Sequence, residues 1–155
     1  GVAAGAGANI ALACDIVIAR KSARFIQSFV NIGLAPDVGG TWNLPRLAGL
    51  PRALGYAMLG EPVDAETAEA WGMIWKAVED DAFDAEVERV TARLAGLPPL
   101  ALAGIKRNMR GAFDLTLEQQ LVLERDLQQQ LGFSSDYAEG VAAFAEKRPG
   151  RFEGR

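Results

Sequence analysis

The chain has 155 residues, of which 50% are apolar and 23% are charged, as is typical of one compact domain of ordinary size. Its formal net charge of −4 argues against a general nucleic-acid-binding surface, because binding phosphates needs an excess of Lys and Arg on one face. We therefore expect small molecules or proteins as partners, and no nucleic acid.

The sequence contains no histidine and a single cysteine, Cys14. This removes Ser-His and Cys-His nucleophile pairs and the usual zinc sites, so we expect no metal site. Acid–base chemistry near neutral pH would then fall to a carboxylate, or less favourably to a Lys, a Tyr or Cys14. One cysteine allows no internal disulfide, and we expect a cytoplasmic protein.

The first nineteen residues are mostly apolar or small, but they do not have the pattern of a membrane span or a secretory signal. Most are Gly and Ala, and Asp15 at membrane depth would cost about 2.5–3.5 kcal/mol. No basic segment precedes the run, so we expect no membrane partner. A domain that begins inside apolar sequence suggests the C-terminal part of a longer chain.

The small residues from Gly5 to Asn9 predict a turn, followed by a helix over 10–14 and a buried strand over 16–19. Glycines before a helix can leave backbone N–H groups directed at an anion or oxyanion. Small residues are also needed where a helix packs closely against a sheet. Both interpretations of the turn remain open from these residues alone.

The stretch from Gly33 to Trp42 places one carboxylate, that of Asp37, in a stiff loop. Pro36 fixes its own φ and extends the residue before it, while Gly39 and Gly40 allow a sharp turn. A helical pattern follows directly. Asp37 is therefore either an N-terminal cap or dipole partner of that helix, or a carboxylate aimed at a ligand.

The remaining pattern predicts alternating elements and then helices only. Pro51 starts one helix that Gly60 ends, and Asp64 caps the next. Trp71 and Trp75 are predicted to be core residues. A strand is predicted over 25–29, and residues 71–78 lead into a last short strand. The predicted helices cover 51–59, 64–70, 85–94, 100–109, 115–131 and a last one from Ser134 or Ser135 through 145. The polar 115–131 helix is typical of one lying across another subunit or domain.

Four segments together resemble the crotonase (enoyl-CoA hydratase/isomerase) superfamily over essentially the whole chain. They are the small-residue run 4–15, the Pro-Asp-x-Gly-Gly-Thr-Trp-x-Leu-Pro-Arg run 36–46, the segment 68–73 and the ending 139–148. The resemblance implies an α/β fold: the C-terminal part of a spiral of ββα units over 1–80, then a helical trimerisation region over 81–155.

The resemblance also implies an oxyanion hole in which a peptide N–H of the Gly5-Ala6-Gly7 turn, best matched by Ala6, holds the thioester oxygen as an enolate develops. Such a donor contributes about 3–4 kcal/mol to catalysis. The second donor would come from sequence before Gly1. Family hydratases use two glutamates to activate water, and here their places are taken by Asn9 and Phe29. This difference argues against hydration of an enoyl-CoA.

The catalytic residue that remains is Asp37, at the position where isomerase-type members carry their working aspartate. The implied function is an acyl-CoA isomerase that rearranges a ring epoxide to an oxepin, as in phenylacetate degradation, or shifts a Δ3 double bond to Δ2. Coenzyme A enters as part of the substrate and no other cofactor is expected. The implied substrate-binding residues are Asn9, Phe29, Ile32, Leu34, Phe144 and Lys147.

For the last two residues an alternative remains open, with Phe144 in the core and Lys147 a solvated helix-end cation. The resemblance implies a homotrimer or hexamer. Two other functions also remain: a family hydratase of other specificity, or a non-catalytic truncated fragment that binds CoA or mediates oligomerisation. We expect residues 1–155 alone to be a poor catalyst and to associate, because an unpaired strand edge and apolar surface would be exposed.

Overall fold

A computed structural model describes all residues from 1 to 155 and has a mixed α/β architecture. The chain forms two compact units, Gly1–Glu88 and Arg89–Arg155. The first contains every strand, and the second is helical. The fold is that expected for the C-terminal part of a crotonase-type chain, while the division predicted between residues 80 and 81 stays a prediction.

Two small sheets organise the first unit. β1 (Val2–Ala4) pairs in parallel with β3 (Arg24–Ile26), which pairs antiparallel with β4 (Val63–Asp64). The second sheet joins β2 (Ile18–Arg20) and β5 (Lys76–Val78) in parallel. Parallel neighbours need a crossover between them, and here the crossovers carry the helices that cover the sheets.

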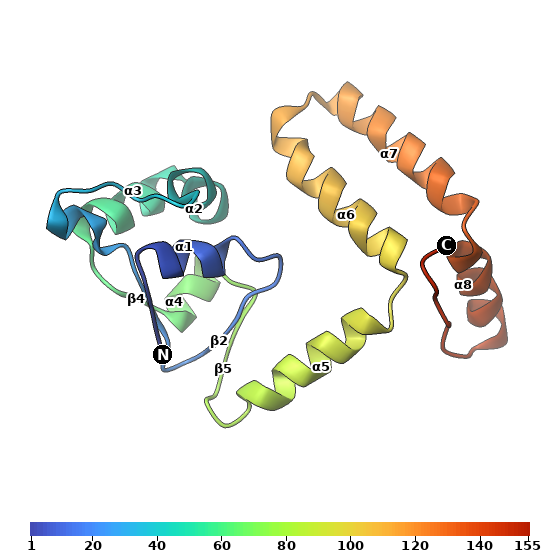
Figure 1. Cartoon of the computed structure of the whole chain (residues 1–155), viewed down its shortest axis with the longest axis horizontal. Coiled ribbons are helices and arrows are strands. Elements are labelled where there is room, and N and C mark those ends of the chain that lie inside the picture. The colour runs from blue at the N-terminus through green and yellow to red at the C-terminus, as the bar shows by residue number, and fades with distance from the viewer. The chain divides into compact units, whose positions relative to one another are not determined.

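Five helical segments follow these strands: α1 (Ala6–Leu12), the 3-10 helix η1 (Ser28–Ile32), α2 (Gly40–Ala48), α3 (Leu50–Leu59) and α4 (Ala65–Ala70). Figure 1 shows α2 and α3 side by side, with α1 between them and the strands. The loop from Gly33 to Gly39 therefore connects η1 to a helix that packs on α1.

The core of the first unit forms where these helices meet the strands. Ala65 and Ala68 on α4 are completely buried, because small side chains allow the helix to approach closely. Trp71 packs against this core as predicted. Trp75 is 66% exposed, so its prediction as a core residue is wrong. The buried core includes Leu12, Ala19, Phe25, Leu44, Ala48, Ala53, Tyr56, Val63, Met73 and Ile74.

The strand predicted over 25–29 is only half correct. β3 ends at Ile26, and Phe29 lies in η1. The β-strand pairing ends before Gln27. The side chain of Gln27 is fully buried and donates a hydrogen bond to Asn9, and the residues after it form η1. The helix predicted over 10–14 instead begins at Ala6, and the strand predicted over 16–19 begins at Ile18.

Helix α5 (Phe83–Ala95) follows the last strand, and the second unit then contains α6 (Pro99–Gly111), η2 (Ala112–Asp114), α7 (Leu117–Gly132) and α8 (Ser135–Glu146). Helices α6 and α7 lie side by side (Figure 1). A Cβ on Gly104 would lie 2.8 Å from a Leu127 methyl group, so a larger residue there would displace the Leu127 side chain. No helix combines the length and the apolar composition needed to cross a bilayer.

Candidate functional site

The loop that carries Asp37 is held by its main chain. The Asp37 carbonyl accepts a hydrogen bond from the Gly40 N–H at 2.8 Å and another from Asn9 Nδ2 at 2.9 Å. The next two residues, Val38 and Gly39, have φ of 48° and 75°. A β-branched residue in this left-handed region is strained and persists only where its surroundings enforce the conformation.

The Asp37 carboxylate, in contrast, makes no hydrogen bond or ion pair within the chain and is exposed. Helix α2 begins at Gly40, its N-cap is Gly39, and no side chain caps it. The alternative that Asp37 caps this helix is therefore wrong. A carboxylate on a fixed backbone with its oxygens unoccupied is available to a ligand.

Asn9 fixes this loop from the adjacent helix. Its side chain is 1% exposed, and its Oδ1 accepts a hydrogen bond of 2.7 Å from Nε2 of the buried Gln27. Both polar ends of the Asn9 amide are thus used inside the protein. Its predicted contact with substrate stays a prediction.

The Gly5 turn lies at the start of the same helix. Gly5 has φ of 53° and donates its N–H to the Ile26 carbonyl at 2.8 Å, so this group is committed to the sheet. Ala6 and Gly7 occupy the first turn of α1, where N–H groups have no intrahelical acceptor. The role of Ala6 and Gly7 in an oxyanion hole stays a prediction, while the Gly5 N–H is already used.

The Phe29 side chain packs against this turn. A Cβ placed on Gly5 would lie 3.6 Å from the Phe29 ring, and Phe29 is buried. The structure thus brings Phe29, Asn9 and Asp37 together around α1 and the turn at its start. Whether Phe29 also meets substrate stays a prediction.

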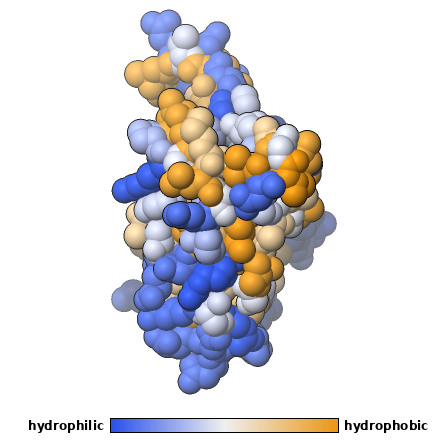
Figure 2. All heavy atoms as spheres, turned by 90° about the vertical axis from the view of Figure 1, so that its left-hand side faces the viewer, coloured by the Kyte–Doolittle hydropathy of each residue, from blue (hydrophilic) through white to orange (hydrophobic).

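Ile32 and Leu34 lie on the approach to Asp37 and are 74% and 60% exposed. Val38 and Trp42 of the same segment are exposed as well. Figure 2 shows apolar atoms open to the surface between polar ones on the face it presents. Exposed apolar residues next to a free carboxylate fit an acyl group more readily than a polar ligand.

Phe144 and Lys147 belong to the second unit. Phe144 is 87% exposed, so the alternative that it is a core residue is wrong. Lys147 ends α8 in the left-handed conformation with φ of 56°. Their predicted contacts with CoA stay predictions.

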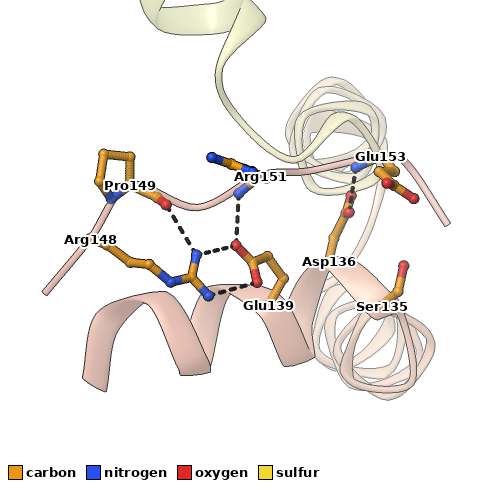
Figure 3. A pocket seen from close by; sticks show the side chains of 7 residues that line it. All are labelled: Ser135, Asp136, Glu139, Arg148, Pro149, Arg151 and Glu153. Carbon is orange, nitrogen blue, oxygen red and sulfur yellow. Dashed lines mark hydrogen bonds and ion pairs between the residues drawn. The ribbon is translucent and has the colours of Figure 1, made fainter. Parts of the chain in front are cut away.

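A pocket of about 720 Å³ lies between α8 and the C-terminal residues. Figure 3 shows the tail clasp, defined here as Asp136, Glu139, Arg148, Arg151 and Glu153. Glu139 accepts hydrogen bonds from the Arg148 guanidinium at 2.6 and 3.0 Å and from the Arg151 N–H at 2.9 Å. The Arg148 guanidinium, followed by the Arg151 N–H, lowers the Glu139 pKa to about 2.

Asp136 in this clasp accepts hydrogen bonds from the backbone N–H groups of Glu153 at 2.7 Å and Gly154 at 2.9 Å. The carboxylates of Asp136 and Glu139 are therefore occupied by donors of their own unit. We interpret the tail clasp as structural.

Sequence reasoning missed Gln27, whose buried side chain bonds the Asn9 amide that holds the Asp37 loop. One signal was available: Gln27 is the one amide within the largely apolar run Phe25-Ile26-Gln27-Ser28-Phe29, where a buried polar group needs partners.

The chain matches the family model described as enoyl-CoA hydratase/isomerase over residues 1–155. It is 50% identical to the 1,2-epoxyphenylacetyl-CoA isomerase of Escherichia coli K12, covering all of this chain and 59% of that protein. A probable enoyl-CoA hydratase of Rhodobacter capsulatus is also 50% identical, with 60% of its length covered.

Among solved structures, an enoyl-CoA hydratase from Polaromonas sp. JS666 is similar with a TM-score of 0.94 and 38% identity, over 99% of this chain and 60% of that one. The chain thus spans about 60% of the length of the relatives it matches.

Proposed function

Because the chain belongs to the enoyl-CoA hydratase/isomerase family, we propose that the whole protein is an acyl-CoA isomerase with Asp37 as its acid–base group. The observation that carries the proposal is the contrast between the main chain and the side chain of Asp37. Its carbonyl is held by two hydrogen bonds, while its carboxylate has none. General acid–base catalysis requires such a group, fixed in place but free to exchange a proton.

In the proposed reaction on a 3-enoyl-CoA, the Asp37 carboxylate takes a proton from C2 and returns one at C4, which moves the double bond from Δ3 to Δ2. The Ala6 N–H holds the thioester oxygen while the dienolate exists. This electrostatic contribution is about 3–4 kcal/mol per donor. The free first-turn N–H of Ala6 and the committed N–H of Gly5 support the choice of Ala6.

The rearrangement of a ring epoxide to an oxepin, with 2-(1,2-epoxy-1,2-dihydrophenyl)acetyl-CoA as substrate, is the more specific form of the proposal. Support comes from the 50% identity to the E. coli protein that bears an epoxyphenylacetyl-CoA isomerase name. In this reaction Asp37 would exchange a proton or stabilise developing positive charge. Ile32 and Leu34 would contact the acyl group.

Hydration is the second candidate, because a relative of equal identity is named a probable enoyl-CoA hydratase. The site gives this candidate less support. A carboxamide is no general base, and both polar ends of the Asn9 amide already have partners. Phe29 offers no group that holds water and is buried.

The proposal includes a homotrimer or hexamer in the cytoplasm, with coenzyme A as part of the substrate and no further cofactor. Phe144 and Lys147 would lie near the CoA moiety, where a Lys meets phosphate as a point charge. Exposed apolar side chains along α7, among them Leu117 and Leu121, are the surface we assign to subunit contacts.

The test is a direct comparison of two assays on the whole protein, including any sequence that precedes Gly1. A 3-enoyl-CoA and the ring epoxide report isomerisation, and a short 2-enoyl-CoA reports water addition. We expect isomerisation of at least one of the first two substrates and negligible hydration. Hydration at a rate comparable to isomerisation would establish the second candidate, and no turnover of any of the three would favour a non-catalytic CoA-binding protein.

A further inference from the structure

We propose that Gln27 and Asn9 form a buried positioning relay that fixes the Asp37 loop for proton transfer. Gln27 directly follows β3, Asn9 lies on α1, and the relay ends on the Asp37 main chain. The inference rests on the proposed catalytic role of Asp37. Neither residue is assigned proton transfer, so both are positioning residues.

The first link joins Asn9 to the loop. Its Nδ2 donates to the Asp37 carbonyl across 28 positions of sequence. The amide also packs against the first residue of α2, since a Cβ on Gly40 would lie 2.4 Å from Asn9 Nδ2. Gly40 donates to the same Asp37 carbonyl, so the amide contacts both groups that define the turn.

Gln27 supplies the second link. Its side chain is 0% exposed, and it donates from Nε2 to Asn9 Oδ1 at 2.7 Å. This bond holds the Asn9 amide in the orientation that points Nδ2 at the loop. Because Gln27 has no exposed surface, an effect of Gln27 on catalysis has to act through its neighbours.

The Tyr56 hydroxyl and Gln27 Oε1 are both buried, and neither completes a hydrogen bond in this conformation. The relay therefore consists of the two bonds that the structure contains, from Gln27 to Asn9 and from Asn9 to the Asp37 carbonyl.

The relay explains how the strained backbone at Val38 is maintained. Without the Asn9 bond, the Asp37 carbonyl keeps only its contact to Gly40 within a tight turn. The left-handed Val38 would then relax, and the carboxylate would no longer be presented in one place. Small misplacements of a catalytic group lower the rate strongly, so we expect a kinetic effect.

The experiment uses Gln27→Met in the whole protein, because methionine keeps the length and apolar packing but removes the amide that donates to Asn9. We expect kcat to fall about tenfold with KM within about twofold, because the reacting groups remain and only their alignment is lost. Gln130→Met on the exposed surface of α7 is the matched control and should leave kcat unchanged.

Amide hydrogen exchange provides the second readout. Exchange of the Gly40 N–H should become faster in Gln27→Met, while that of Ala68 in the core helix α4 stays protected. If kcat is unchanged, or if protection falls equally at Gly40 and Ala68, the amide only stabilises the fold and the relay is wrong.

Asn9→Leu keeps nearly the same shape and removes the bond to the Asp37 carbonyl, so it decides the question if Gln27→Met does not fold. Faster Gly40 exchange in Asn9→Leu supports the relay, and unchanged exchange overturns it. Asp37→Asn is assayed in parallel. Normal turnover in that variant would disprove the proposed function, while the exchange data would still decide whether the relay holds the loop.

Discussion

The Asp37 loop and the tail clasp hold carboxylates in opposite ways. In the tail clasp, Glu139 and Asp136 receive hydrogen bonds on their side-chain oxygens from Arg148 and from backbone N–H groups. In the loop, the bonds go to the Asp37 carbonyl and the carboxylate receives none. The oxygens of a carboxylate that stabilises structure already accept hydrogen bonds from the protein. A carboxylate that acts on a substrate needs a fixed main chain and side-chain oxygens without such bonds.

Each region also contains one non-glycine residue with positive φ. Val38 beside Asp37 is a β-branched residue at φ of 48°, and the buried Asn9 and Gln27 amides hold its turn. In the clasp, Lys147 before Arg148 has φ of 56°, but it is not β-branched and ends α8 as its C-cap. The β-branched residue is the more strained of the two, and such strain costs on the order of 1–3 kcal/mol.

The largest expected effect is that of Asp37→Asn in the whole protein. We expect kcat for isomerisation to fall by about 10²–10⁴, the range for loss of one general acid–base group. The melting temperature and the affinity for a CoA thioester should stay nearly unchanged, since the carboxylate makes no internal bond. Steady-state kinetics and thermal unfolding measure the two quantities.

Asp81→Asn is the matched control, because Asp81 is also exposed and makes no hydrogen bond or ion pair in the chain. It should have normal kcat. A lower melting temperature with normal kcat in Asp37→Asn would make Asp37 a structural residue like those of the clasp, and the comparison between the two regions would fail.

The next largest effect is that of Asp136→Ala in the tail clasp. This change leaves the N–H groups of Glu153 and Gly154 without their acceptor, and such losses cost about 1–3 kcal/mol of stability. Urea unfolding should show the loss, and hydrogen exchange should become faster at Glu153 and Gly154. Unchanged protection at those two amides would show that the clasp does not hold the tail.

Asp64→Ala allows a carboxylate that caps a helix to be compared with Asp37, which caps none, within the same unit. The Asp64 side chain accepts the Thr67 N–H at 2.7 Å, and this bond lowers its pKa. Loss of a cap should reduce the melting temperature by a few degrees. Asp37→Ala should not reduce it, and equal shifts in the two variants would mean that Asp37 caps after all.

The smallest expected effect is a pH dependence of the tail clasp. Glu139 has its pKa lowered from 4.5 to about 2 in the folded chain, so its stabilising contribution is complete above about pH 4.5 and is lost as pH falls towards 2. Exchange at Arg151 should therefore become faster over that window. In Glu139→Gln this change should be absent, and an identical pH profile in both proteins would assign it to another group.

Local signals in the sequence predicted much of the fold. Gly60 ends α3 in the left-handed conformation, Asp64 caps α4 and Ser134 caps α8, as their residue types indicate. The chain's place in the crotonase superfamily was also evident from its motifs, and the family match confirms it.

The parts that could not be predicted depend on contacts between distant residues. The bond from Asn9 to Asp37 and that from Gln27 to Asn9 span 28 and 18 positions, and no local pattern specifies them. The end of β3 at Ile26 follows from the same buried amide network. The tail clasp was missed because Glu139 and Asp136 look like ordinary surface acids of a helix until the C-terminal residues fold back on them.

The central claim is that the Asp37 carboxylate moves the substrate proton, and breaking of the C2–hydrogen bond tests it most directly. A 3-enoyl-CoA deuterated at C2 is mixed with excess whole protein in a single turnover, so that substrate binding and product release do not limit the rate. We predict that Asp37→Asn slows the loss of deuterium from C2 by the same factor of about 10²–10⁴ as kcat. Loss of the label at the wild-type rate in Asp37→Asn would contradict the account.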